Sequence, residues 1–240
     1  MQRYSIIHEK NPREILLLKG LGCRWRRCTF CDYHLDASPD EQDNLTVNRT
    51  AMQRVTGLYH RLEVINSGSV PELGQTTLNE LRALCLQKEI RTLHLECHWL
   101  YRDEIPRLRA FFAAVGTSLK IKTGVETFDY AFREGVLKKG ITEKDPHRIA
   151  EQFDECCLLF GLSGQTVEGM IGDIEQGLAC FERVCVNLFV ENTTRVKPND
   201  AVRAAFIRSV LPRYRNHSRV DVLLHNTDFG VGKEKAEHEK

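Results

Sequence analysis

The sequence has no apolar run that approaches the roughly 20 residues of a membrane-spanning helix. Its start, MQRYSIIHEKNPREILLL, also lacks the apolar core and the small-residue cleavage site of a secretion signal. A strong charge of either sign is absent too. The formal net charge is +1, so no global field draws the chain toward nucleic acid or an anionic membrane. We therefore expect a cytoplasmic protein with no membrane partner, and nothing indicates a nucleic-acid partner.

Internal repeats and linker-like stretches are also missing from the 240 residues. Hydrophobic residues make up 42% of the chain, which is ordinary for a soluble protein that buries one core. We predict a single domain over residues 1–232. Residues 233–240, KEKAEHEK, carry charge and no core side chain, so a disordered tail is predicted there.

Nine cysteines are present, and an odd number in a cytoplasmic protein makes a disulfide framework unexpected. Three of them, Cys23, Cys28 and Cys31, lie together in a polar, basic loop where packing gives no reason for a cysteine. The other six occupy apolar or periodic segments and are expected to be small buried hydrophobic residues. These six are Cys85, Cys97, Cys156, Cys157, Cys180 and Cys185.

Short apolar runs alternate with helix-like segments along the chain. Strands are predicted at 14–20, 62–68, 91–97, 119–127, 157–164, 183–192 and 219–227. Helices are predicted at 46–60, 76–90, 103–116, 128–140, 166–182 and 199–212. Repeated strand–helix units predict right-handed crossovers and a parallel sheet, so the fold class is α/β with a partial (β/α)6-type barrel. Chemistry in such a barrel is expected at the carboxyl ends of the strands.

The loop GLGCRWRRCTFCDYH spaces its cysteines as C-x4-C-x2-C. Thiolates hold both iron–sulfur clusters and structural zinc. A four-iron cluster on three cysteines would leave one iron open for a ligand. A structural zinc site is normally closed by four ligands, and His34 could supply the fourth. The spacing alone leaves both metals open.

CTFCDYH after the first strand resembles the signature loop of the radical S-adenosylmethionine (SAM) superfamily. In that loop three cysteines follow the first strand and an aromatic residue, here Phe30, precedes the last one. The sequence departs from the usual C-x3-C-x2-C by one extra residue. The resemblance implies a [4Fe–4S] cluster on Cys23, Cys28 and Cys31, with SAM as second cofactor. It also implies a barrel of the radical SAM kind and an electron donor such as flavodoxin or ferredoxin.

Two further segments extend the resemblance toward the SAM amino acid and ribose. NSGS resembles the segment that holds the SAM amino group and implicates Asn66, Ser67, Gly68 and Ser69. In GVETFDYAFREGVLKKGI, the resemblance places Glu126 at the ribose and Arg133 at the SAM carboxylate, a role that suits a bidentate donor.

Each of these residues also has a simpler interpretation. Glu126 could cap the following helix, and Arg133 could pair with Glu134 or Asp129. The serines around Gly68 could form a plain turn.

A last segment, LLFGLSGQT, resembles the strand that lies along the adenine in this superfamily. It implicates Ser163 and Gly164, with Ser163 where the family often has proline. The combined resemblance covers residues 14–192.

The compact chain shows no second C-x2-C array for an auxiliary cluster. CDYHLDAS, VINSGSVPE and HNTDFG resemble small, queuine lyase-like radical SAM proteins of queuosine salvage. The resemblance implies an enzyme that abstracts hydrogen from a small polar substrate such as queuine. It would be a lyase that breaks a carbon–nitrogen or carbon–carbon bond and releases a 7-deazapurine base. Candidate substrate contacts are His34, Asp36, Glu191, Asn226 and Asp228.

Two other functions remain open from the sequence. One is a radical SAM enzyme that modifies tRNA, and the other is a non-catalytic module that binds zinc or an iron–sulfur cluster.

Anaerobic reconstitution is expected to load about four iron and four sulfide per chain. Ala in place of Cys23, Cys28 or Cys31 should abolish this loading, because each thiolate would hold one iron. Cys85→Ala is the matched control and should load fully. Stoichiometric zinc without iron after anaerobic purification would contradict the cluster.

Overall fold

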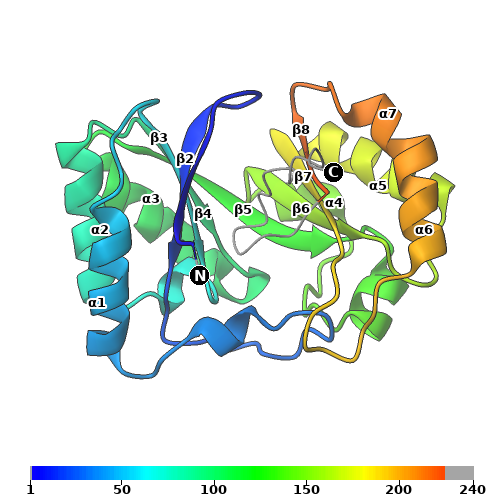
Figure 1. The fold of residues 1–240 in the computed structure, drawn as a ribbon, viewed down its shortest axis with the longest axis horizontal. Coiled ribbons are helices and arrows are strands. Elements are labelled where there is room, and N and C mark those ends of the chain that lie inside the picture. The colour runs from blue at the N-terminus through cyan, green and yellow to red at the C-terminus, as the bar shows by residue number, and fades with distance from the viewer. Residues whose placement is uncertain (1, 225–240) are drawn as a thin grey trace, which may run out of the picture.

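The computed structural model describes residues 2–224, and its strands form one curled, open sheet (Figure 1). The sheet holds eight strands in chain order; β1 is antiparallel to β2, and every later neighbour is parallel. The predicted partial barrel is thereby confirmed, with one short antiparallel strand, β1, that the sequence did not indicate. The strands are β1 (Tyr4–Ile7), β2 (Arg13–Leu18), β3 (Arg61–Asn66), β4 (Thr92–Glu96), β5 (Ser118–Glu126), β6 (Glu155–Phe160), β7 (Arg183–Leu188) and β8 (Val220–Leu223).

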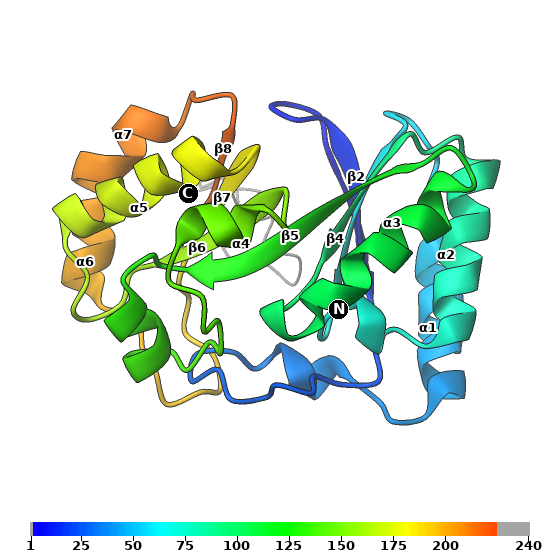
Figure 2. The ribbon, with the colours of Figure 1, turned by 180° about the vertical axis from the view of Figure 1, so that it is seen from behind.

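Helices cover the outer face of this sheet in two groups. Figures 1 and 2 show α1, α2 and α3 beside one half of the sheet and α5, α6 and α7 beside the other. Within residues 2–224, no helix is long and apolar enough to cross a membrane. The helices are α1 (Glu41–Met52), α2 (Gln75–Gln87), α3 (Ile105–Ala113), α4 (Pro146–Ala150), α5 (Val167–Cys180), α6 (Asp200–Ala205) and α7 (Leu211–Tyr214).

Three predicted helices differ from the structure. The helix predicted at 46–60 is α1, which begins at Glu41 and already ends at Met52. The segment 128–140 forms only a π-helical turn, Phe132–Val136. The Glu134 carboxylate accepts hydrogen bonds from Gly140 N at 2.7 Å and Ile141 N at 3.0 Å, which bends the chain back after the turn. The segment 199–212 is divided into α6, a π-turn and α7, because Pro212 cannot donate a helical hydrogen bond.

The main core lies between the outer face of the sheet and the helices. Alternate strand residues such as Val64, Ile121 and Leu158 are buried there against Phe112 of α3, Ile174 of α5 and their neighbours. Side chains of a strand point alternately to the two faces, so the residues between them face the inside of the barrel.

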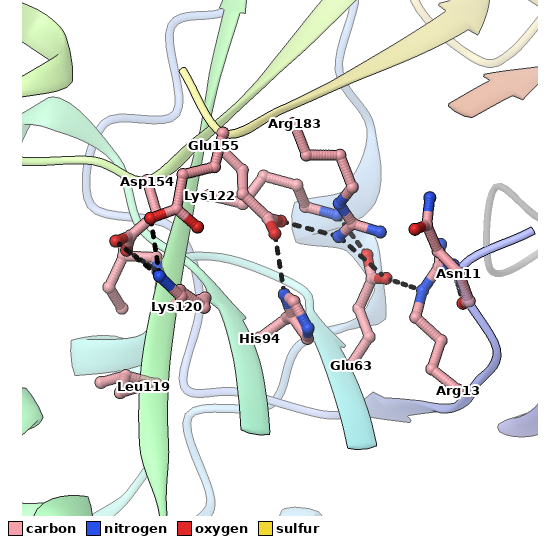
Figure 3. A network of polar contacts seen from close by, with 12 residues as sticks. Asn11, Arg13, Glu63, His94, Leu119, Lys120, Lys122, Asp154, Glu155 and Arg183 are labelled. Atoms are coloured by element: carbon pink, nitrogen blue, oxygen red, sulfur yellow. Dashed lines mark hydrogen bonds and ion pairs between the residues drawn. The ribbon is translucent and has the colours of Figure 1, made fainter. Parts of the chain in front are cut away.

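The inward-facing residues nearest the amino ends of the strands are charged (Figure 3). We call Arg13, Glu63, His94, Lys122, Glu155, Arg183 and Asp221 the floor network. The strands were predicted from short apolar runs, but at this end of the sheet their inner face is charged.

Glu63 is the centre of the floor network. Its carboxylate contacts Arg13 and Lys122 and lies 3.4 Å from Nη2 of Arg183. Burial alone would raise the pKa of Glu63, but these three cations hold it well below its usual range. Glu155 continues the network, 2.7 Å from Arg183 and 2.9 Å from His94.

Glu63→Ala should lower the free energy of unfolding by about 3–5 kcal/mol, because it leaves buried cations without a partner. The matched control is Glu80→Ala, which breaks an exposed pair with Arg49 and should cost at most about 1 kcal/mol. Urea unfolding in the same state of cluster loading measures both. Equal costs would contradict the central role of Glu63.

The floor network should also make stability depend on pH in the acidic range. Burial would raise the pKa of Glu155, but His94 and Arg183 lower it from 4.5 to about 2. Because the pKa of Glu155 is lower in the folded protein than in the unfolded chain, the ionised carboxylate stabilises the fold at pH values above the unfolded pKa. This contribution is lost as the pH falls toward about 2. The urea concentration at the midpoint of unfolding should therefore fall as the pH is lowered from 4.5 to about 2. In Glu155→Gln this midpoint should depend less on pH.

Candidate functional site

A cavity of about 620 Å³ runs from the carboxyl ends of the strands down to the floor network. Small-molecule and cofactor sites typically measure about 300–1,000 Å³. The segments that follow β2 and β7 lie along the same edge of the sheet (Figure 1). They meet where Asn192 Nδ2 donates to the carbonyl of Phe30 at 2.7 Å. The carboxyl ends of the strands, where chemistry was expected, therefore surround the upper part of this cavity.

Cys23, Cys28 and Cys31 all line this cavity, are half-buried and form no disulfide. Their loop is fixed to the π-turn after β5, because Thr29 N donates to the carbonyl of Leu137 at 3.1 Å. Burial raises the pKa of the Cys31 thiol to about 12. A metal reverses this effect, since a coordinating thiol is deprotonated.

The donor set fits an iron–sulfur cluster, because three thiols line one cavity and a four-iron cluster takes one thiolate at each of three irons. Within residues 2–224, no three His, Cys, Asp or Glu side chains are grouped to hold a single metal ion. Lys139 supplies a positive charge beside Cys28 and Cys31, which suits an anionic cluster.

The extra residue of the cysteine loop is accommodated by packing around Trp25. The Trp25 ring stacks on His98 with centroids 5.5 Å apart, and its Nε1 donates to the carbonyl of Lys138 at 2.8 Å. A side chain at Gly140 would collide with this ring. Arg26 turns the loop with a left-handed φ of 44°. C-x4-C is therefore an ordered variant of the cysteine loop.

The segment after β3 brings Asn66, Ser67, Gly68 and Ser69 to the cavity, as the sequence predicted. Glu72, which the sequence analysis missed, fastens this segment to the cysteine loop. Its carboxylate accepts from Ser69 N at 2.6 Å and from Arg24 N at 2.5 Å. The signal was present as a Ser-x-x-Glu capping box from Ser69 to Glu72.

Glu126 ends β5 beside the cysteines and forms an ion pair with Lys139 at 2.7 Å. Its φ of 69° and the register shift between Gly124 and Glu126 turn the carboxylate inward. The pair packs directly over Gly124, where a Cβ would lie 2.6 Å from the Lys139 ammonium. Burial alone would lower the pKa of Lys139, but Glu126 and Cys28 raise it, so the ammonium stays charged.

Three residues implicated in SAM binding do not line the cavity: Arg133, Ser163 and Gly164. Arg133 is fully buried, and its Nη2 donates to the carbonyls of Ile141 and Glu143 at 3.2 and 2.5 Å. The predicted helix is reduced to a π-helical turn, and Lys139, which follows this turn, lines the cavity where Arg133 was expected. Ser163 accepts from Asn199 Nδ2 at 2.9 Å.

Three predicted substrate contacts, His34, Asp36 and Glu191, do line the cavity. Arg3 holds Asp36 with two hydrogen bonds of 2.6 and 3.0 Å. Glu191 is 68% exposed and pairs with Lys197 at 3.0 Å. Asn226 and Asp228 lie outside the described residues, as does the predicted tail at 233–240.

The lower part of the cavity contains an ion pair that was not among the predicted contacts. Glu96, the last residue of β4, lies 3.1 Å from Lys122 of β5. For Lys122, the signal in the sequence was the alternating charge of KIK in β5.

Comparison with solved structures decides the family. The chain is 38% identical to queuine lyase from Clostridium spiroforme bound to SAM and queuine, over 97% of this chain and 100% of that one, with a TM-score of 0.91. This chain belongs to the queuine lyase-like group of the radical SAM superfamily. Methylornithine synthase shares the fold alone, at 12% identity and a TM-score of 0.50, over 94% of this chain and 77% of that one. No protein-family model and no curated protein matches.

Lys139 should matter for SAM affinity in this queuine lyase-like protein, because it is a buried cation between Glu126 and the cysteines. Lys139→Met should weaken SAM binding by about 1.5–3 kcal/mol through loss of a charge-assisted contact. Lys138→Met, at the exposed neighbouring position, is the matched control. Calorimetry on the reconstituted variants measures the change, and equal affinities would contradict the role of Lys139.

Proposed function

We propose that this protein is a radical SAM lyase that acts on queuine and releases a 7-deazapurine base. The observation that carries the proposal is the 38% identity to queuine lyase along the whole length of that chain. The cavity gives physical support, because it joins a cysteine-lined region to a polar floor within about 620 Å³. The proposed reaction is the cleavage of a carbon–nitrogen or carbon–carbon bond in the substrate.

The upper part of the cavity is proposed to hold the cofactors. When bound and reduced, a [4Fe–4S] cluster supplies the electron that cleaves SAM into methionine and a 5′-deoxyadenosyl radical. Cys23, Cys28 and Cys31 would hold the cluster. A flavodoxin or ferredoxin is the proposed electron donor, and the cytoplasm the proposed location.

This chain's own residues would orient SAM and screen its charge. The 66–69 segment offers the Ser69 hydroxyl and backbone groups to the amino group, and Glu126 can accept hydrogen bonds from the ribose hydroxyls. Lys139 would stand near the carboxylate. Trp25 and His98 lie at the cavity next to the cysteine loop and would limit the access of water to the cluster.

The lower part of the cavity is proposed to hold the substrate. Glu96 is one-third exposed and is held by Lys122, so its free lone pairs can accept the N–H groups of a 7-deazaguanine. Ile15, Leu17 and Ile65 form a small apolar cluster on the β2–β3 side of the cavity, which suits the flat ring. Bound substrate would shield Glu96 from water, so an analogue without these N–H groups would leave its carboxylate short of donors and should bind more weakly.

The test is the reconstituted protein with SAM, dithionite and queuine under anaerobic conditions. Queuine should yield 5′-deoxyadenosine together with a truncated deazapurine. Adenine lacks the N–H edge that Glu96 would accept, and guanine keeps this edge but lacks the cyclopentenediol side chain, so both should leave SAM cleavage at background. Glu96→Gln should weaken queuine binding, because an amide cannot replace a carboxylate that accepts two N–H groups. Glu182→Gln, an exposed residue at the amino end of β7, is the control. Equal 5′-deoxyadenosine with and without queuine would overturn the assignment.

A further inference from the structure

Two cysteines without a part in the cluster face the middle of the cavity. Cys157 of β6 and Cys185 of β7 are register partners on neighbouring parallel strands. Both line the cavity, with 8% and 6% of their surfaces exposed. Because they are register partners, the two side chains are neighbours on the inner face of the sheet, and Cys185 is the largest influence on the pKa of the Cys157 thiol. The adjacent Cys156 points the other way, is fully buried, and packs near Gly177 of α5.

The position of Cys157 lies between the two ends of the cavity. Along β6 it follows Glu155 of the floor network and precedes Leu159, which packs with Phe30 of the cysteine loop. The rise of a strand puts each of these neighbours about 7 Å from Cys157 along β6. A substrate between the cluster and the floor would therefore lie beside this thiol.

The surroundings of Cys157 keep it in the protonated form. Cys185 and burial raise the pKa of the Cys157 thiol well above its usual range, although Lys122 opposes the shift. A protonated thiol is a poor nucleophile and metal ligand, but it can give up a hydrogen atom. An S–H bond is weaker than the C–H bonds of most organic molecules, so this transfer to a carbon radical is downhill.

We propose that Cys157 is the hydrogen-atom donor that quenches the product radical, with Cys185 positioning its thiol. The inference rests on the proposed lyase reaction, in which bond cleavage leaves one fragment with an unpaired electron on carbon. The S–H bond of Cys157 breaks, a C–H bond forms on that fragment, and a thiyl radical remains on sulfur. One electron and one proton restore the thiol, and the electron comes from the low-potential one-electron donor that also reduces the cluster.

The electron donor acts twice in each turnover, and this fixes how much SAM is used for each product. One electron cleaves SAM and a second restores Cys157, so each product is accompanied by one methionine and one 5′-deoxyadenosine. SAM is then consumed as a co-substrate. Return of the hydrogen atom from 5′-deoxyadenosine would instead regenerate SAM.

The experiment is the queuine reaction of the reconstituted enzyme in D2O, where thiols carry deuterium. The product fragment formed by wild-type protein should carry one carbon-bound deuterium by mass spectrometry. Cys157→Ala should still cleave SAM when queuine is present, while the reduced product and its deuterium fall to background. Cys157→Ser should behave in the same way, because an O–H bond is too strong to donate. Cys185→Ala should lower the yield of product per 5′-deoxyadenosine.

Controls separate this role from a structural one. Cys156→Ala, on the same strand but facing α5, should keep the wild-type label and product ratio. Iron content and calorimetric affinities for SAM and queuine should be unchanged in Cys157→Ala. Two results would overturn the role of Cys157 as hydrogen-atom donor: labelled product at the wild-type ratio from Cys157→Ala, or unlabelled product from the wild-type protein. Neither result would contradict the lyase assignment. Absence of queuine-dependent cleavage in wild type would overturn both.

Discussion

The ion pairs around Glu63 are the constraint on which the rest of the structure depends. Glu63 contacts Arg13, Lys122 and Arg183, so one carboxylate of β3 links strands β2, β5 and β7. An open, curled sheet with an inner face lined only by apolar side chains would favour collapse of the cavity. Charged groups that satisfy one another resist such collapse, because any rearrangement would leave a buried charge without a partner. They link β2, β3, β5 and β7 to one another at the floor of the cavity.

The chemistry of the cavity changes from the floor network toward the cysteine loop. Side chains of a strand alternate between the two faces of the sheet, so each strand contributes every second residue to the cavity. The first inward positions carry the ion pairs, the next carry Ile15, Ile65 and the thiols of Cys157 and Cys185, and the last carry Glu126 and Phe189. A polar group of the substrate can therefore bind the floor network, while the reacting carbon of the substrate lies among side chains that are not strong bases. Such an order suits radical chemistry, which needs positioning and exclusion of water more than proton transfer.

The cysteine loop depends on residues that are not ligands. Glu72 ties its start to the 66–69 segment, Trp25 packs on His98, and Lys139 places a cation beside Cys28 and Cys31. The three cysteines belong to one short loop, but the partners that hold this loop come from the segments after β3, β4 and β5. Metal-binding residues in general need such a surrounding shell to keep their geometry.

The sequence by itself determined the order of most strands and helices, the parallel sheet and the cysteine loop, because these depend on local periodicity and spacing. The family was indicated by the resemblance of short motifs, and the match to a solved structure along the whole chain then showed it. Tertiary structure decided which residues enter the cavity. Arg133 was expected there, yet the chain bends after Glu134, so that Arg133 is buried outside the cavity and Lys139 takes the inner position. The charged floor was equally hidden, since Arg13, Glu63, Lys122 and Arg183 are far apart in the chain and neutralise one another only after the sheet has curled. Local patterns carry no record of such partners, because their energies come from contacts between distant segments.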